Sequence, residues 1–160
     1  MPKEIINKPG KLDEGEWAIV KAHTIEGQHM LEKIGGLMRE IGRIVRASHE
    51  RWDGRGYPDG LSGDAIPIEA RIVCACDAFN AMTTTRPYRS ARSHSEAVAD
   101  LERCAGTQFD PRVVDAVLSV VAQDHEETEQ RRVGAFAVAA AGEERHPLGE
   151  LSAGTLGLAP

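Results

Sequence analysis

Aromatic residues are scarce in this chain, at 4% of its 160 residues, and aliphatic side chains supply most of its 41% hydrophobic content. Strands are enriched in aromatic and β-branched residues, so this balance favours helix packing over a β-sandwich. The chain has no run of about 18 apolar residues, and we therefore expect no membrane span. No apolar segment follows a basic stretch at the N-terminus, so we expect no signal peptide either.

Cysteine and positive charge are also limited. The three cysteines, Cys74, Cys76 and Cys104, fit neither a disulfide framework nor a zinc-binding pair. We interpret them as reduced core residues of a cytoplasmic protein. The net charge is −6, and the segment from Asp124 onward holds seven acidic and three basic residues. Duplex nucleic acid needs a basic binding surface, so it is not an expected partner.

Helical periodicity dominates the part of the chain before residue 124. Capping boxes mark two helix starts, one at Asp13 with Glu16 and one at Ser93 with Glu96. Apolar residues three and four positions apart follow these starts and recur in other segments. We predict an all-α helix bundle. The first predicted helix begins at Asp13, and the second includes Met30 to Ile34. Further helices are predicted over residues 37–49, 67–82, 93–104 and 110–121.

The periodic pattern ends at Gln123. Residues 124–132 are mostly charged, and residues 133–160 are rich in alanine and glycine. We therefore predict one domain over residues 1–123 and a tail over 124–160. The tail is expected to be largely disordered apart from a short alanine helix near Val138.

A long structured loop is expected between residues 51 and 63, because its glycines and proline exclude a regular helix. Charged and aromatic residues alternate with glycine from Ser48 to Pro58. Taken alone, such a stretch is as compatible with an ordinary surface loop as with a binding site.

The pattern His-Glu-x-x-Asp-Gly-x-Gly-Tyr-Pro at His49–Pro58 resembles the signature of the HD-GYP domain family. Further short motifs occur in the order and spacing of that family, and so many linked motifs make a chance match improbable. The resemblance extends over about residues 1–123. These motifs are Lys8–Leu12, Lys21–His23, Ile66–Pro67, Ala70–Val73, Asp77–Phe79, Arg86–Arg89 and Gly106–Pro111.

The resemblance implies metal-dependent hydrolysis of cyclic di-GMP in bacterial signal transduction. Two or three iron or manganese ions are implied as cofactors, with His23, His49 and Asp77 at ligand positions. Arg86 and Arg89 match positions that hold the substrate phosphates. No catalytic residue is implied beyond the metal ligands. The signature loop at the rim of the site contributes Glu50, Asp53, Gly54, Gly56, Tyr57 and Pro58.

Simpler interpretations exist for each of these residues. A histidine at a helix end, as His23 is, is more often a cap or a surface residue than a metal ligand. Arg86, Arg89 and Arg92, spaced by three, could form a solvated basic face. Asp77 lies in an apolar helix, where an unpaired buried carboxylate would be costly and would need a cation.

The sequence also departs from the family pattern. Met1 stands directly before the segment that follows a His-Asp doublet in the family, so that doublet is absent here. Ser48 replaces a histidine of the signature, and Asn80 replaces an aspartate. We therefore predict a truncated or degenerate HD domain that is inactive on its own. The missing helices would leave apolar faces of residues 37–45 and 68–82 uncovered, which predicts self-association.

Three functional hypotheses remain open at the level of the sequence. The chain could be part of a phosphodiesterase, or a non-catalytic protein that binds cyclic di-GMP through Arg86 and Arg89. It could also be an interaction module whose Gly-Tyr-Pro loop docks a partner such as a diguanylate cyclase domain. Loss of Tyr57 should matter most to docking, whereas loss of Arg86 should matter most to nucleotide binding.

Overall fold

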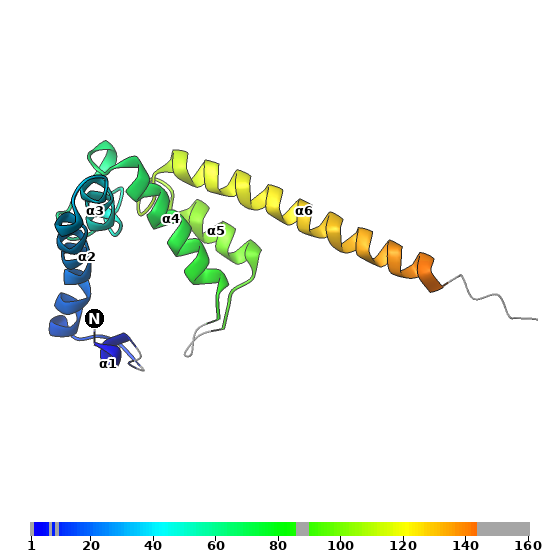
Figure 1. Ribbon diagram of the computed structural model, residues 1–160, viewed down its shortest axis with the longest axis horizontal. Helices are drawn as coiled ribbons and strands as arrows, with labels where there is room; N and C mark the ends of the chain where they lie inside the picture. Colours follow the sequence, from blue (N-terminus) through cyan, green and yellow to red (C-terminus); the bar gives the residue numbers. More distant parts are fainter. Residues whose placement is uncertain (1, 7, 9, 86–89, 144–160) are drawn as a thin grey trace, which may run out of the picture. The chain divides into compact units, whose positions relative to one another are not determined.

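The structure is a computed structural model, and it describes residues 2–6, 8, 10–85 and 90–143. Within these ranges it contains helices and no strand, which confirms the predicted all-α class (Figure 1). No described helix is long and apolar enough to cross a membrane. The helices are α1 (Lys3–Ile6), α2 (Glu14–Ile34), α3 (Met38–Ala47), the 3-10 helix η1 (Gly63–Ala65), α4 (Ile68–Thr83), α5 (His94–Cys104) and α6 (Pro111–Glu143).

The chain divides into two compact units, residues 1–120 and 121–160. The motifs that resemble the HD-GYP family all lie in the first unit. The second unit contains the continuation of α6 as its described structure.

Helices α2 and α3 pack against each other and are joined at Gly35 and Gly36, both of which have positive φ. The predicted capping box at Asp13 and Glu16 is present at the start of α2. The two sequence segments expected before Gly35 form one continuous helix instead of two. Gly27, in the middle of α2, permits close packing, because a Cβ there would lie 2.9 Å from a methyl group of Val45.

Helices α4, α5 and α6 enclose the larger hydrophobic core of the first unit. Leu101 of α5 is fully buried against Ala75 of α4 and against Val113 and Val114 of α6. Phe109, in the turn before α6, completes this cluster. The capping box at Ser93 and Glu96 starts α5 as expected, so the same short pattern fixed two helix starts.

A smaller core joins α3 to α4. Ala47 at the end of α3 and Ala70 in α4 are buried around Ile66, whose side chain is only 1% exposed. Ile66 directly follows η1, so its burial anchors the short helix in which the long loop ends.

Helix α6 continues past Gln123 to Glu143, whereas the sequence predicted a largely disordered tail from Asp124. The apolar pattern does end near residue 121, but the following residues are good helix formers and contain no proline before Pro147. Glu127 and Arg131 also make an ion pair one turn apart, at 3.5 Å. The helix propensity of these residues therefore extends α6 beyond the segment that has an apolar face. Residues 144–160 lie outside the described ranges.

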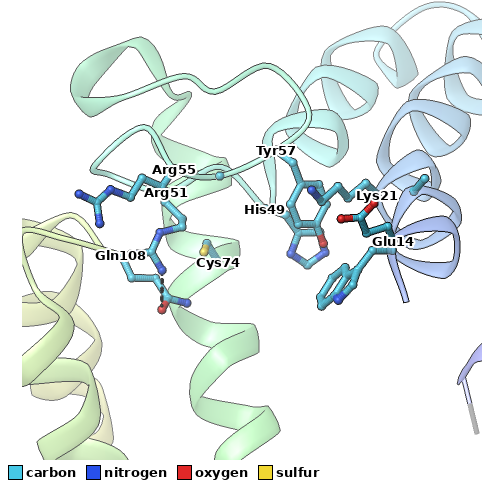
Figure 2. A pocket seen from close by; sticks show the side chains of 11 residues that line it. Glu14, Lys21, His49, Arg51, Arg55, Tyr57, Cys74 and Gln108 are labelled. Atoms are coloured by element: carbon cyan, nitrogen blue, oxygen red, sulfur yellow. Dashed lines mark hydrogen bonds between the residues drawn. The ribbon is translucent and has the colours of Figure 1, made fainter. Parts of the chain in front are cut away.

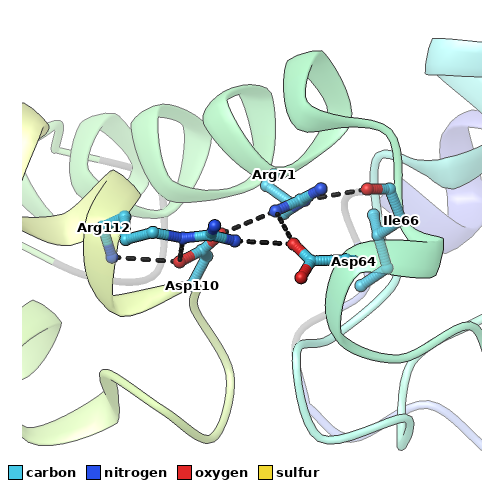
Figure 3. Close-up of polar contacts among 5 residues, drawn as sticks. All are labelled: Asp64, Ile66, Arg71, Asp110 and Arg112. Atoms are coloured by element: carbon cyan, nitrogen blue, oxygen red, sulfur yellow. Dashed lines mark hydrogen bonds and ion pairs between the residues drawn. The ribbon is translucent and has the colours of Figure 1, made fainter.

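A buried carboxylate ties α4 to the start of α6 (Figure 3). The Asp110 side chain is fully buried and accepts hydrogen bonds from Arg71 of α4, at 2.8 Å, and from Arg112. Arg112 binds both carboxylate oxygens, and its backbone N–H also donates to Asp110, which therefore caps α6. Asp64 of η1 pairs with both arginines from the solvent side, with 76% of its side chain exposed.

The same two arginines hold the long loop. The guanidinium groups of Arg71 and Arg112 each lie 5.5 Å from the ring centroid of Trp52. Cations placed over an indole face are attracted by its π electrons. Backbone hydrogen bonds from Trp52 to Gln108 and from Asp53 to Thr107 add a second attachment. The loop is thereby fixed to the turn that precedes α6.

Replacement of Asp110 by alanine should destabilise the protein strongly. It would leave Arg71, whose side chain is only 10% exposed, without its buried partner, which costs about 3–5 kcal/mol in comparable cases. Urea denaturation followed by circular dichroism measures this loss. Asp64→Ala is the control, because the exposed Asp64 pairs with the same arginines and its removal should leave the urea midpoint nearly unchanged. Equal losses of stability in the two variants would contradict the structural role of the buried Asp110 carboxylate.

The contribution of Asp110 should also depend on pH. Hydrogen bonds from Arg112 and then Arg71 lower the pKa of Asp110 from 3.8 to about 2, against the opposing effect of burial. The folded state thus holds this proton less tightly than the unfolded state does. The stability difference between wild type and Asp110→Asn should be constant above pH ~4 and should shrink as the pH falls from about 4 to about 2.

Candidate functional site

The long loop between α3 and η1, residues 48–62, is stabilised from within by two of its acidic residues. Glu50 is 2% exposed, and one of its oxygens accepts hydrogen bonds from the backbone N–H groups of Asp59 and Gly60. Asp53 forms a two-point ion pair with Arg51, which holds the pKa of Asp53 at about 2. These two signature carboxylates therefore shape the loop.

Gly54 and Gly56 of the signature are required by the backbone itself. Gly54 has a φ of 77°, a conformation that L residues rarely adopt. A Cβ on Gly56 would lie 2.4 Å from the backbone nitrogen of Arg51, where no side chain fits. This close approach folds the loop back on itself, and the backbone N–H of Tyr57 donates to the carbonyl of His49. A cis peptide bond joins Tyr57 to Pro58.

The folded loop brings Tyr57 onto His49 and His49 onto His23. The rings of Tyr57 and His49 are stacked with centroids 5.1 Å apart, and the ring of His23 meets His49 edge-on at 5.0 Å. His23 comes from the middle of α2, and its Nδ1 is hydrogen-bonded to the carbonyl of Val20. Two residues that the sequence placed at ligand positions are thus neighbours, although they are far apart in the chain.

A pocket of about 720 Å³ opens beside these rings (Figure 2). The cationic side chains of Lys21, Arg51 and Arg55 line it together with His49 and Tyr57. The ammonium of Lys21 lies 5.9 Å from the centre of the Tyr57 ring. A concave site with aromatic surfaces and several positive charges is suited to an anionic aromatic ligand. The remaining lining residues are Glu14, Trp17, Ala18, Gly56, Cys74 and Gln108.

The protonation states of the aromatic pair follow from their burial. Burial lowers the pKa of His49, the nearby His23 lowers it further, and Asp77 partly opposes the shift. His49 is therefore neutral at pH 7, which is the form that binds a metal or accepts a proton. Burial, together with Cys74 and Asp77, raises the pKa of Tyr57, so its hydroxyl remains a hydrogen-bond donor.

Thiol chemistry is not supported at this pocket. Burial and the charge of Asp77 raise the pKa of Cys74 to about 11. A nucleophilic cysteine needs a lowered pKa, so Cys74 is a packing residue of the pocket wall. Cys76 is exposed, in contrast to the core position expected for it.

Asp77 differs from its sequence interpretation in one respect. Its side chain is exposed on α4, so the argument that it must be a buried carboxylate in need of a cation is wrong. Apolar neighbours in the sequence did not indicate burial here, because Ile72 and Val73 of the same helix are themselves 45% and 44% exposed. Asp77 nevertheless lies near enough to His49 and Tyr57 to raise the pKa of both.

The metal site implied by the resemblance is only partly built from the residues that the structure describes. His23 and His49 offer two adjacent imidazoles, and the bond from His23 to the Val20 carbonyl is of the kind that orients metal-binding histidines. No group of three histidine, cysteine or acidic side chains that could hold a metal ion occurs within the described ranges. These residues therefore do not complete a metal site as they are placed.

The two positions that depart from the family pattern have local roles. The Ser48 hydroxyl donates to the carbonyl of Val45 at the end of α3, at 2.9 Å. The side-chain oxygen of Asn80 accepts a hydrogen bond from Thr84 at the end of α4. Arg86 and Arg89, predicted to hold phosphates, lie outside the described residues.

Several pocket residues were not assigned a role from the sequence. Glu14, Trp17 and Lys21 lie on α2, and Arg55 is the variable residue between the two signature glycines. Lys21 stands two residues before His23 in a motif of the family pattern. This short separation from a predicted metal ligand could have indicated that Lys21 also lies at the site. The others could be found only after the fold had placed α2 against the loop.

Comparison with known proteins identifies the family. A family model described as HD domain matches residues 1–113, and the chain belongs to the HD domain family. The HD-GYP resemblance is confirmed by its relatives. The chain is 44% identical over 124 residues to the cyclic di-GMP phosphodiesterase response regulator RpfG of Xanthomonas campestris, and 39% identical over 121 residues to a cyclic di-GMP phosphodiesterase of Thermotoga maritima.

Another relative acts on a mixed cyclic dinucleotide. The chain is 40% identical over 113 residues to 3'3'-cGAMP-specific phosphodiesterase 3 of Vibrio cholerae. These matches cover 77%, 75% and 71% of this chain but only 33%, 33% and 24% of the three relatives. The chain thus spans at most about a third of the length of these proteins.

A solved structure supports the fold. The crystal structure of a cyclic GMP-AMP-specific phosphodiesterase of Vibrio cholerae aligns with a TM-score of 0.58 and 18% sequence identity. The alignment covers 75% of this chain and 31% of that structure.

The titration of His49 tests the geometry of this site. In a pH titration followed by NMR, the His49 ring should protonate at a lower pH than an unperturbed histidine side chain, because burial and His23 both disfavour its charged form. His23→Ala should raise the pKa of His49, whereas Asp77→Asn should lower it further. A His49 pKa that neither substitution changes would mean that the three side chains are not neighbours.

Proposed function

We propose that this chain forms the nucleotide-binding part of a phosphodiesterase that hydrolyses a cyclic dinucleotide, with cyclic di-GMP as the first candidate. The observation that carries the proposal is the pocket that His49 and Tyr57 of the signature line together with the cationic side chains of Lys21, Arg55 and Arg51, the last of which is paired with Asp53. Cyclic di-GMP has two purines and two phosphodiesters, which match aromatic surfaces and positive charges. The three relatives named above act on cyclic di-GMP or 3'3'-cGAMP, which supports the same substrate class.

The proposal includes a metal requirement. Iron or manganese would supply an activated water and neutralise charge on the phosphate. His23, His49 and Asp77 would be this chain's share of the ligands, and Arg86 and Arg89 would contact the phosphates. Since the described residues do not complete a metal site, further ligands would have to join these three.

Ser48 and Asn80 favour an alternative in which the domain binds the nucleotide without cleaving it. A serine hydroxyl that donates to the Val45 carbonyl is a poor replacement for an imidazole ligand. In a further alternative the Gly-Tyr-Pro loop docks a diguanylate cyclase domain. A cytoplasmic location for either role stays a prediction from the sequence.

Self-association is part of the proposal as well. Ile68, Ile72 and Val73 expose large parts of their side chains along α4, and Leu37 is 72% exposed at the start of α3. Large apolar side chains exposed in this way favour contact with a second protein surface.

Hydrolysis of cyclic di-GMP by the purified chain, measured anaerobically with iron(II) or manganese(II), tests the enzymatic proposal. Any turnover by this chain should depend on the added metal and should fall about 100-fold in His49→Ala, because a metal ligand would be lost. His29→Ala is the matched control, since His29 is exposed on α2 and does not line the pocket. Metal-independent turnover that survives His49→Ala would contradict the proposed site.

If the chain does not hydrolyse cyclic di-GMP, binding assays distinguish the two non-catalytic alternatives. Cyclic di-GMP that binds and is not cleaved would favour the non-catalytic role, and binding should then weaken in Arg86→Ala. Cyclase docking without nucleotide binding would favour the third role, and it should be lost in Tyr57→Ala.

Light scattering at micromolar concentration tests self-association. We expect a dimer or larger species, and Ile72→Lys should shift it towards the monomer because it charges the exposed face of α4. A wild-type monomer would contradict this part of the proposal.

A further inference from the structure

One face of α2 supplies three chemically different side chains to the pocket. Glu14, Trp17 and Lys21 are spaced by three and four residues, so they lie in a row along one side of the helix. Figure 2 shows Glu14 and Lys21 across the pocket from Arg51 and on the side of His49 and Tyr57. From Glu14 to Lys21 the row extends about 10 Å along the helix axis.

These three side chains do not cap or stabilise α2, in contrast to the neighbouring Glu16. Glu16 completes the capping box of α2 and pairs with Lys8 at 2.6 Å. In the described part of the chain, no hydrogen bond or ion pair is made by the carboxylate of Glu14 or the ammonium of Lys21. Trp17 is 45% exposed, although an indole is costly to leave in water.

The order of the row corresponds to the parts of a guanine nucleotide. A carboxylate can accept two hydrogen bonds, from N1–H and from the 2-amino group of guanine. An exposed indole offers a surface on which a purine stacks, and an ammonium binds a phosphate oxygen. Adenine has no N1–H and no 2-amino group, so it offers Glu14 no matching pair of donors.

We propose that Glu14, Trp17 and Lys21 form a guanine-nucleotide subsite in which Glu14 selects guanine over adenine. This inference rests on the proposed function and deepens it, because it names the residues that choose the base. Trp17 carries the base, and Lys21 holds a phosphate beside the Tyr57–His49 stack. Glu14 lies in the first turn of α2.

Calorimetric titration of the full chain with cyclic di-GMP and with cyclic di-AMP tests the subsite. The wild type should bind cyclic di-GMP more tightly. Glu14→Gln should reduce that preference about tenfold, because an amide cannot accept both hydrogen bonds from guanine. Lys21→Met should weaken both nucleotides by a similar factor of about ten, because the phosphate is common to them.

Trp17→Phe provides a spectroscopic readout. Stacking on Trp17 should quench its fluorescence when cyclic di-GMP binds, and the phenylalanine variant should bind with modest loss while the quenching disappears. Glu26→Gln and Lys33→Met are the controls, because both residues are exposed on α2 and neither lines the pocket. Unchanged urea midpoints would show that the exposed substitutions leave the fold intact.

The possible outcomes separate this inference from the proposed function. If the wild type binds cyclic di-GMP and the Glu14 and Lys21 variants behave like their controls, the subsite is wrong and the proposed function stands. If the wild type binds neither nucleotide, both are wrong. Loss of guanine preference in Glu14→Gln alone, with weakening of both nucleotides in Lys21→Met, supports the assignment.

Discussion

The buried carboxylate of Asp110 is the interaction on which the arrangement of this domain depends. It caps α6, binds Arg71 of α4 and holds Arg112, and both arginines contact the ring of Trp52. A buried charge is tolerated only when it is fully paired, so these groups have little freedom to rearrange. Helix α4, the start of α6 and the signature loop are therefore fixed relative to one another by one cluster of charges.

The candidate site follows from that constraint. With Trp52 held at one end and Glu50 bonded to the backbone at Asp59 and Gly60, the loop turns back over itself at Gly56. The turn stacks Tyr57 on His49, and α2 brings His23 and the pocket face to the same place. The acidic and glycine residues of the signature thus act through the shape of the loop, and its histidine and tyrosine face the pocket.

The sequence predicted local features well and spatial neighbours poorly. Both capping boxes and the long loop were predicted because each depends on residues a few positions apart. The sequence divided α2 into two segments although one helix runs from Glu14 to Ile34, and it did not predict α6 beyond Gln123 because the amphipathic pattern ends near residue 121. The exposure of Asp77 could not be predicted, since burial depends on which helices cover a face. The resemblance identified His23 and His49, but Glu14 and Trp17 required the fold.

The central claim is that the signature loop and α2 together form a cyclic dinucleotide pocket. NMR mapping of the chain during addition of cyclic di-GMP tests it most directly. The account predicts that the largest chemical-shift changes will fall on His49, Tyr57 and the Glu14–Lys21 face of α2, and that α5 will be unaffected. Saturable binding that shifts only residues away from this pocket would contradict it.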